Sequence, residues 1–174
     1  MKVKGRVYVA LVLSILLYGS EGWGDLRAAL VTKLATFHHR CARHMYGITR
    51  RDVWKRHITT RVVLDSVGLR SVEGYLHTRL MTWAGHVARM SHTRLPRNIL
   101  FSWINHPRPA GGQQMNYGRR LWKALGRDND FVHAFGEGHS KANWVDAAQD
   151  RGRWRSFAAR TPTKPKSRRP ATII

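Results

Sequence analysis

Apolar residues recur every three or four positions between Ser71 and Pro96, and this is the clearest helical period in the chain. The residues of this apolar arc are Val72, Leu76, Leu80, Trp83, Val87 and Met90. Ser71 is a suitable N-cap, because its hydroxyl can accept a hydrogen bond from a free N–H of the first turn. Pro96 lacks an N–H and restricts the residue before it, so the pattern predicts that the helix ends before Leu95.

A second row of side chains runs along one edge of this arc, and it consists of Tyr75, Arg79, Thr82, His86 and Arg89. One face of the helix is expected to enter a core, while its border presents cations and one aromatic ring. For His86 a hydrogen-bonded structural role is favoured over a contact with a phosphate or a base.

A nearly unbroken apolar run from Val7 to Tyr18 follows Lys2, Lys4 and Arg6. Twelve residues are too few to span a bilayer core, which needs about 20. The layout also fits a signal peptide, but we favour a buried helix that leaves an apolar surface for another domain. The same surface is expected to let isolated chains self-associate.

Another amphipathic helix is predicted from its N-cap Asp25 to Tyr46, where Gly47 ends it. Its expected apolar face is Leu26, Leu30, Leu34, Phe37, Cys41 and Met45. The cations Lys33, Arg40 and Arg43 flank that face. Cys41 is interpreted as a small core residue, because a nucleophilic cysteine needs a placed base.

The remaining segments predict short helices joined by breakers. They are expected at 50–58, at 60–67 between Thr60 and Gly68, at 97–104, at 119–125 with Trp122 and Leu125 inward, and at 141–159 after Ser140. Residues 106–117 and 126–138 are expected to be irregular, and the proline-containing basic tail 161–174 to be disordered. The fold class is therefore all-α: an irregular helical bundle with a loop-rich C-terminal extension.

The charge balance is extreme, with 31 Lys and Arg against 10 Asp and Glu and a net charge of +21. Arginine, which matches phosphate oxygens with a planar fork of donors, outnumbers lysine by 23 to 8. A polyanion is therefore the expected partner, in preference to a merely solvated surface.

The sequence lacks the residues that several kinds of functional site require. Cys41 is the only cysteine, so neither a disulfide framework nor a zinc finger can be built. No Gly-rich phosphate loop, HExxH, GxSxG or CxxC occurs, and the ten carboxylates are dispersed, whereas polymerases gather theirs around two metal ions. No cofactor or metal is expected in this chain, and no catalytic residue can be named.

Four stretches carry a resemblance to a known family. They are LLYGSEGW at Leu16–Trp23, KLATFHHRCARHMYGITRRD at Lys33–Asp52, RLMTWAGHVARM at Arg79–Met90 followed by RLP at Arg94–Pro96, and WVDAAQDRGRW at Trp144–Trp154. In this order they resemble the C-terminal, thumb and post-thumb region of reverse transcriptases of non-LTR (LINE-like) retrotransposons. The resemblance spans about Val7 to Phe157, and no FADD-type catalytic box accompanies it.

The resemblance implies a thumb-like module that grips the backbone of RNA or DNA while a palm domain, with its Mg²⁺, performs the polymerase chemistry. The isolated chain is then not expected to be an enzyme. The residues expected to hold nucleic acid are Arg40, Arg43, Arg79, Arg89, Arg119 and Arg120, with Tyr75 stacking.

The same reading divides the chain into four parts: an apolar helix (1–24) packing on the palm, a thumb-like core (25–105), a helical extension (106–160) and the basic tail (161–174). Two alternatives stay open: a stand-alone basic RNA-binding protein and a degenerate, non-functional retroelement remnant. The nucleus or cytoplasm is favoured over secretion, and no membrane partner is expected.

Overall fold

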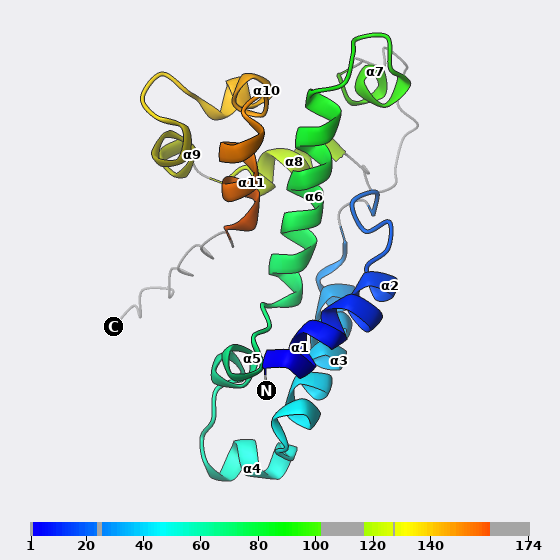
Figure 1. Cartoon of the computed structure of the whole chain (residues 1–174), viewed down its shortest axis with the longest axis vertical. Helices are drawn as coiled ribbons and strands as arrows, with labels where there is room; N and C mark the ends of the chain where they lie inside the picture. The colour runs from blue at the N-terminus through cyan, green and yellow to red at the C-terminus, as the bar shows by residue number, and fades with distance from the viewer. Residues whose placement is uncertain (1, 24–25, 102–116, 127, 161–174) are drawn as a thin grey trace, which may run out of the picture.

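The computed structural model describes residues 2–23, 26–101, 117–126 and 128–160, which form helices, turns and bends and no strand. The helical elements are α1 (Lys2–Tyr8), the π-helical turn η1 (Val9–Leu13), α2 (Ser14–Leu16), α3 (Ala28–Tyr46), α4 (Arg50–Lys55), α5 (Thr60–Val67), α6 (Val72–Ala88), α7 (Leu95–Phe101), α8 (Tyr117–Ala124), α9 (Asp128–Phe135), the 3₁₀ turn η2 (Lys141–Asn143), α10 (Trp144–Ala147) and α11 (Arg151–Ala159) (Figure 1). The predicted all-α fold is confirmed. The tail 161–174 and the predicted loop, up to residue 116, lie outside the described residues.

Helix α6 runs along the long axis of the molecule, from the region of α1 and α5 to the end at which α7 lies (Figure 1). Ser71 caps it as predicted, with its Oγ accepting from the N–H of Gly74 at 3.2 Å. The helix ends at Ala88, earlier than the sequence pattern suggests, so Met90 lies beyond it. Every arc residue from Val72 to Val87 except the half-buried Trp83 is buried, and so are Met81, Ala84 and Ala88 on the other sides. The helix is therefore enclosed by the protein on more than one face.

Two hydrophobic clusters lie along α6. The N-terminal cluster is mostly aliphatic and joins α1–α3 and α5 to the first half of α6; its buried members are Tyr8, Leu13, Leu17, Ala42, Val63, Leu64, Val67, Leu69, Val72 and Leu76. The C-terminal cluster is rich in aromatic rings and joins α8–α11 to the second half of α6; its buried members are Met81, Ala84, Ala88, Leu121, Leu125, Phe131, Phe135, Trp144, Ala147, Ala148, Trp154, Phe157 and Ala158.

The crossing of α6 and α11 depends on one glycine. A side-chain carbon at Gly85 would collide with the indole of Trp154, so only glycine lets the two helices come this close. The indole N–H of Trp154 donates to the carbonyl oxygen of Met81 at 2.7 Å, which satisfies its only polar atom inside the core. The stretches RLMTWAGHVARM and WVDAAQDRGRW thus meet at this contact.

A buried histidine joins α1, α3 and the start of α6. His38 Nε2 must donate to the carbonyl of Arg70 (2.9 Å), so Nδ1 accepts from the hydroxyl of Tyr8 (3.1 Å). Burial lowers the pKa of His38 and raises the pKa of Tyr8, which favours the neutral form of both side chains.

Helix α3 ends as predicted at Gly47, which adopts the left-handed conformation with φ 78°. Its predicted start, Asp25, lies outside the described residues, and its apolar face is rotated from the predicted one. His38 and Ala42 are buried, while Leu30 and Phe37 are exposed. Periodicity placed the larger apolar residues inward, but the small Ala42 and the hydrogen-bonded His38 are what pack beneath α1 and α5. Cys41 is half-buried against the N-terminal cluster, consistent with a core role.

Three predictions about the C-terminal part are wrong. Residues 128–135 form α9 instead of an irregular connection, because Phe131 and Phe135, one helical turn apart, both enter the C-terminal cluster. The predicted last helix is interrupted before Asp150, whose carboxylate caps α11 by accepting from the N–H of Arg153 at 3.0 Å. Trp122 is half-exposed instead of inward, since Leu121 and Leu125 occupy that side of α8.

His86 also differs from expectation. Its side chain is exposed and forms no hydrogen bond with another described residue. No described helix combines the length and the hydropathy needed to cross a bilayer.

Candidate nucleic-acid interface

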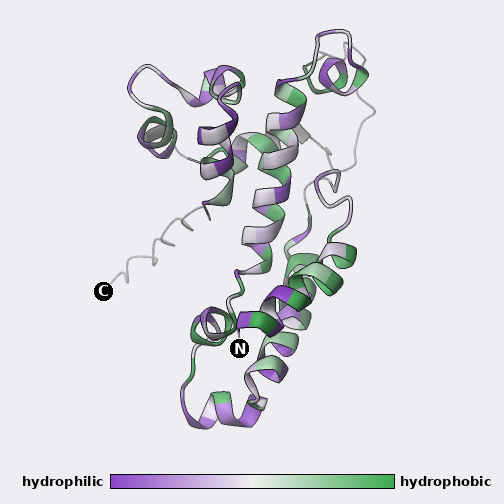
Figure 2. Ribbon diagram, viewed as in Figure 1, coloured by the Kyte–Doolittle hydropathy of each residue, from purple (hydrophilic) through white to green (hydrophobic). Residues whose placement is uncertain are grey.

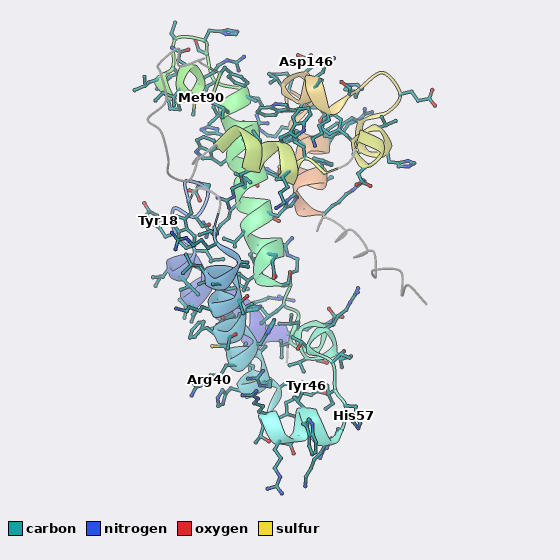
Figure 3. All side chains as sticks on the ribbon, turned by 180° about the vertical axis from the view of Figure 1, so that it is seen from behind. Tyr18, Arg40, Tyr46, His57, Met90 and Asp146 are labelled. Atoms are coloured by element: carbon teal, nitrogen blue, oxygen red, sulfur yellow. The ribbon has the colours of Figure 1, made fainter. Side chains whose placement is uncertain are left out.

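A hollow of about 580 Å³ lies where α3 ends and α4 begins. It is lined by Thr36, Arg40, Arg43, His44, Gly47, Ile48, Thr49 and Arg50. We call it the α3–α4 hollow. Figure 3 shows Arg40, Tyr46 and His57 at this end of the molecule.

The local sequence folds the chain back on itself at this corner. The N–H groups of Gly47 and Ile48 both donate to the carbonyl of Arg43, at 2.9 and 3.1 Å, which closes the last turn of α3. Thr49 and Asp52 then form a capping box: Thr49 Oγ1 accepts from the N–H of Asp52, and the Asp52 carboxylate accepts from the N–H of Thr49. This turn brings Arg50 to the same hollow as the arginines of α3.

Positive charge at the hollow is not neutralised by neighbouring carboxylates. In the described part of the chain, no Asp or Glu forms an ion pair with Arg40, Arg43 or Arg50. The nearby Asp52 carboxylate is held by Thr49, and the hydrogen bonds from the Thr49 side chain and backbone lower the pKa of Asp52. Cations in the last turn also stabilise the C-terminus of α3, but that role leaves their outer N–H groups available to an anion.

The other predicted binding residues lie away from the hollow. Arg79 approaches Glu21 at 3.9 Å and therefore connects α6 to the LLYGSEGW stretch. Arg120 is half-buried on α8 and lines a second hollow, of about 200 Å³, together with Glu73 and His77. Arg119 belongs to α8, but its side chain is outside the described part.

Arg89 and Tyr75 have internal partners. Arg89 Nη1 donates to the carbonyl of Ala148 at 2.7 Å, and burial, with the charge of Arg151, lowers the pKa of Arg89. The guanidinium of Arg70 lies over the ring of Tyr75, 4.9 Å from its centroid, and the Tyr75 hydroxyl accepts from the backbone N–H of Arg70 at 3.4 Å. Both side chains therefore contribute to packing inside the protein, and their contact with nucleic acid stays a prediction.

Sequence reasoning missed His44, Arg50 and the exposed Trp54 at this corner. The pattern T-x-x-D at Thr49–Asp52 was an available signal, because a capping box predicts a helix start and so places Arg50 in its first turn. Among the described residues, no group of three or more His, Cys, Asp or Glu side chains is arranged to hold a metal ion.

Comparison with known proteins gives one informative similarity. The chain is 27% identical over 165 residues to an uncharacterized transposon-derived protein of Caenorhabditis elegans, covering 93% of this chain and 56% of that protein. No family model and no solved structure matches. The chain thus spans about half the length of this relative, and the similarity supports a transposon origin.

Proposed function

We propose that this chain is the thumb-like module of a non-LTR retrotransposon reverse transcriptase and that it binds the nucleic-acid backbone. The observation that carries the proposal is the α3–α4 hollow, in which Arg40, Arg43 and Arg50 gather without an ion-paired carboxylate in the described chain. The net charge of +21 and the transposon-derived relative support it.

The backbone phosphates of RNA or DNA suit this surface. Arginine forks donate two parallel hydrogen bonds to phosphate oxygens, and such contacts carry little sequence information. The module would thus hold a template–primer duplex in any sequence context while catalysis takes place on a palm domain with its own metal ions. The exposed apolar side chains of α1, η1 and α2 are proposed to contact that domain.

A binding measurement with matched variants tests the proposal. Arg40→Ala/Arg43→Ala should weaken binding to duplex DNA for all sequences and reduce the slope of log K against log salt by about 1 to 2. The control Arg155→Ala/Arg160→Ala removes the same charge from exposed positions around the end of α11. Equal losses in both variants would show that net charge alone drives binding and would contradict a role for the hollow.

A degenerate retroelement remnant would have the same transposon origin, so the similarity to the transposon-derived protein fits both an active module and a remnant. Their difference lies in the encoding sequence: an active element requires a palm with paired aspartates in the same reading frame. An upstream frame interrupted by stop codons, together with absent nucleic-acid binding, would favour the remnant.

A further inference from the structure

We infer that Trp54 on α4 is a stacking platform for an unpaired base of single-stranded nucleic acid. This inference rests on the proposed backbone binding and adds a ligand class and a residue that the thumb resemblance does not assign. Trp54 is 77% exposed, although tryptophan carries one of the largest apolar surfaces of any side chain.

No other described tryptophan is so exposed. Trp144 and Trp154 are buried in the C-terminal cluster, and Trp23 and Trp83 are half-buried. Trp122 is 50% exposed, but its ring carries the ammonium of Lys141 at 4.3 Å. The ring of Trp54 stacks on no other described ring or cation, so its faces are available to a ligand.

The backbone under Trp54 is fixed on both sides. The capping box of Thr49 and Asp52 holds the start of α4, and the N–H of Ile58 donates to the carbonyl of Val53 at 3.1 Å after its end. Val53 and Ile58 are half-buried, and Ile58 packs against the N-terminal cluster. The indole is thus presented by an anchored turn, which lowers the entropy cost of binding a ligand.

The surroundings of Trp54 favour nucleic acid over an apolar protein surface. Arg51, Lys55 and Arg56 are exposed within three residues of Trp54, and Arg50 lies one turn before it and lines the α3–α4 hollow. The strongly hydrophilic colour of α4 in Figure 2 reflects this composition. One exposed aromatic ring among several cations suits a single strand, because its bases expose their π-faces while its phosphates need positive charge. In a duplex, by contrast, neighbouring base pairs cover those faces.

The test compares Trp54→Ala with Trp122→Ala in the full chain, using fluorescence anisotropy with a 12-nucleotide oligo(U) strand and a blunt DNA duplex. Stacking on one base predicts that Trp54→Ala weakens binding to the single strand by about 5- to 150-fold. Duplex affinity should change less than about twofold, and Trp54→Phe should retain most of the single-strand affinity. Trp122→Ala should leave both affinities nearly unchanged, and circular dichroism should show that every variant keeps its helices.

Each other outcome has a distinct meaning. If Trp54→Ala binds the single strand as the wild type does, the platform is wrong while backbone binding stands; altered self-association in that variant would assign Trp54 to a protein contact. Equal weakening on single strand and duplex would also overturn stacking on an unpaired base. Absence of any binding by the wild type would overturn the proposed function itself. A selective loss in Trp54→Ala with no effect of Arg40→Ala/Arg43→Ala would keep the platform and overturn the role of the hollow.

Discussion

The two halves of α6 are packed by different kinds of side chain. Around its first half, mostly aliphatic residues come from α3 and α5, which precede it closely in the sequence, and from the more distant α1–α2 segment. Around its second half, aromatic rings come from 40 or more residues further along the chain. Phe135 and Phe157 meet edge-to-face at 5.2 Å between ring centroids, and Trp144 and Trp154 lie 5.9 Å apart.

This difference extends to the polar side chains. In the C-terminal half, Arg89 and Lys141 donate to the main-chain carbonyls of Ala148 and Gly126, so their charges are used to close the fold. In the N-terminal half, Arg40 and Arg50 surround an open hollow. We therefore propose that the aromatic half contributes most of the stability and that the proposed nucleic-acid binding belongs to the aliphatic half.

The largest expected effect is the loss of the Trp154 contact. Trp154→Ala should lower the free energy of unfolding by about 3–5 kcal/mol, because a buried ring and its hydrogen bond to Met81 disappear. Urea denaturation followed by circular dichroism measures the change. For a domain with a typical total of about 5–15 kcal/mol, this loss leaves little stability.

A double-mutant cycle controls for the specific contact with Gly85. Gly85→Ala alone should also destabilise the protein, because its new methyl group collides with the indole. In the Trp154→Ala background the methyl group would occupy vacated space, so the second substitution should cost much less. Additive losses would show that Gly85 is needed for a reason other than Trp154.

The elements that could be predicted from sequence are those with local causes. Ser71 and Gly47 act through groups within one helical turn, so the boundaries of α6 and α3 next to them were found. Helix α9 was missed because Phe131 is stabilised by Phe157, which is remote in sequence. The hollow itself was not predicted: the sequence showed that Arg40 and Arg43 flank one helix, but the approach of Arg50 depends on the turn between two helices.

Arg89 and Arg40 provide the next test, because the sequence interpretation expected both to hold nucleic acid, whereas in the structure Arg89 donates to the Ala148 carbonyl and Arg40 lines the α3–α4 hollow. Arg89→Ala removes a half-buried charged donor from the Ala148 carbonyl and should cost about 1.5–3 kcal/mol of stability. The Arg40 side chain is exposed, so Arg40→Ala should change the free energy of unfolding by less than about 0.5 kcal/mol while weakening nucleic-acid binding. Chemical denaturation and anisotropy on both variants measure these effects. A stable Arg89→Ala protein with weakened binding would reverse the assignment.

A smaller effect on the free energy of unfolding is expected when the pH is lowered. Burial, with the positive charge of Arg70, lowers the pKa of His77 to about 4, and the hollow in front of it also contains Glu73, Arg120 and Lys123. Between pH 6.5 and 4 the unfolded chain therefore binds a proton at His77 that the folded chain does not. The stabilisation that depends on neutral His77 should be fully present above pH 6.5. The free energy of unfolding should then fall by up to about 1.4 kcal/mol per pH unit as the pH decreases to about 4.

Urea denaturation at several pH values measures this slope, and His77→Gln serves as the control because glutamine does not titrate. The variant should show a flatter dependence between pH 6.5 and 4. His38 adds a loss of the same sign, since burial also lowers its pKa. An unchanged slope in His77→Gln would assign the acid sensitivity to other groups.

The smallest effect on folding is expected at the N-terminal helices, where one row of side chains is exposed. This apolar stripe is Val3, Val7, Leu11, Ile15 and Tyr18, and Figure 2 shows hydrophobic colour on these helices. Because the stripe lies outside the N-terminal cluster, Leu11→Lys should leave the free energy of unfolding nearly unchanged.

The same substitution should nevertheless reduce self-association. The net charge of +21 opposes contact between two copies at low salt, whereas about 1 M salt shortens the screening length to about 3 Å and leaves the apolar attraction. Sedimentation equilibrium should therefore show more association of the wild type at 1 M than at 0.1 M salt. Leu11→Lys should stay monomeric, while Val62→Lys, which adds the same charge at an exposed position of α5, should behave like the wild type. Equal behaviour of the two variants would show that added charge, and not the stripe, controls association.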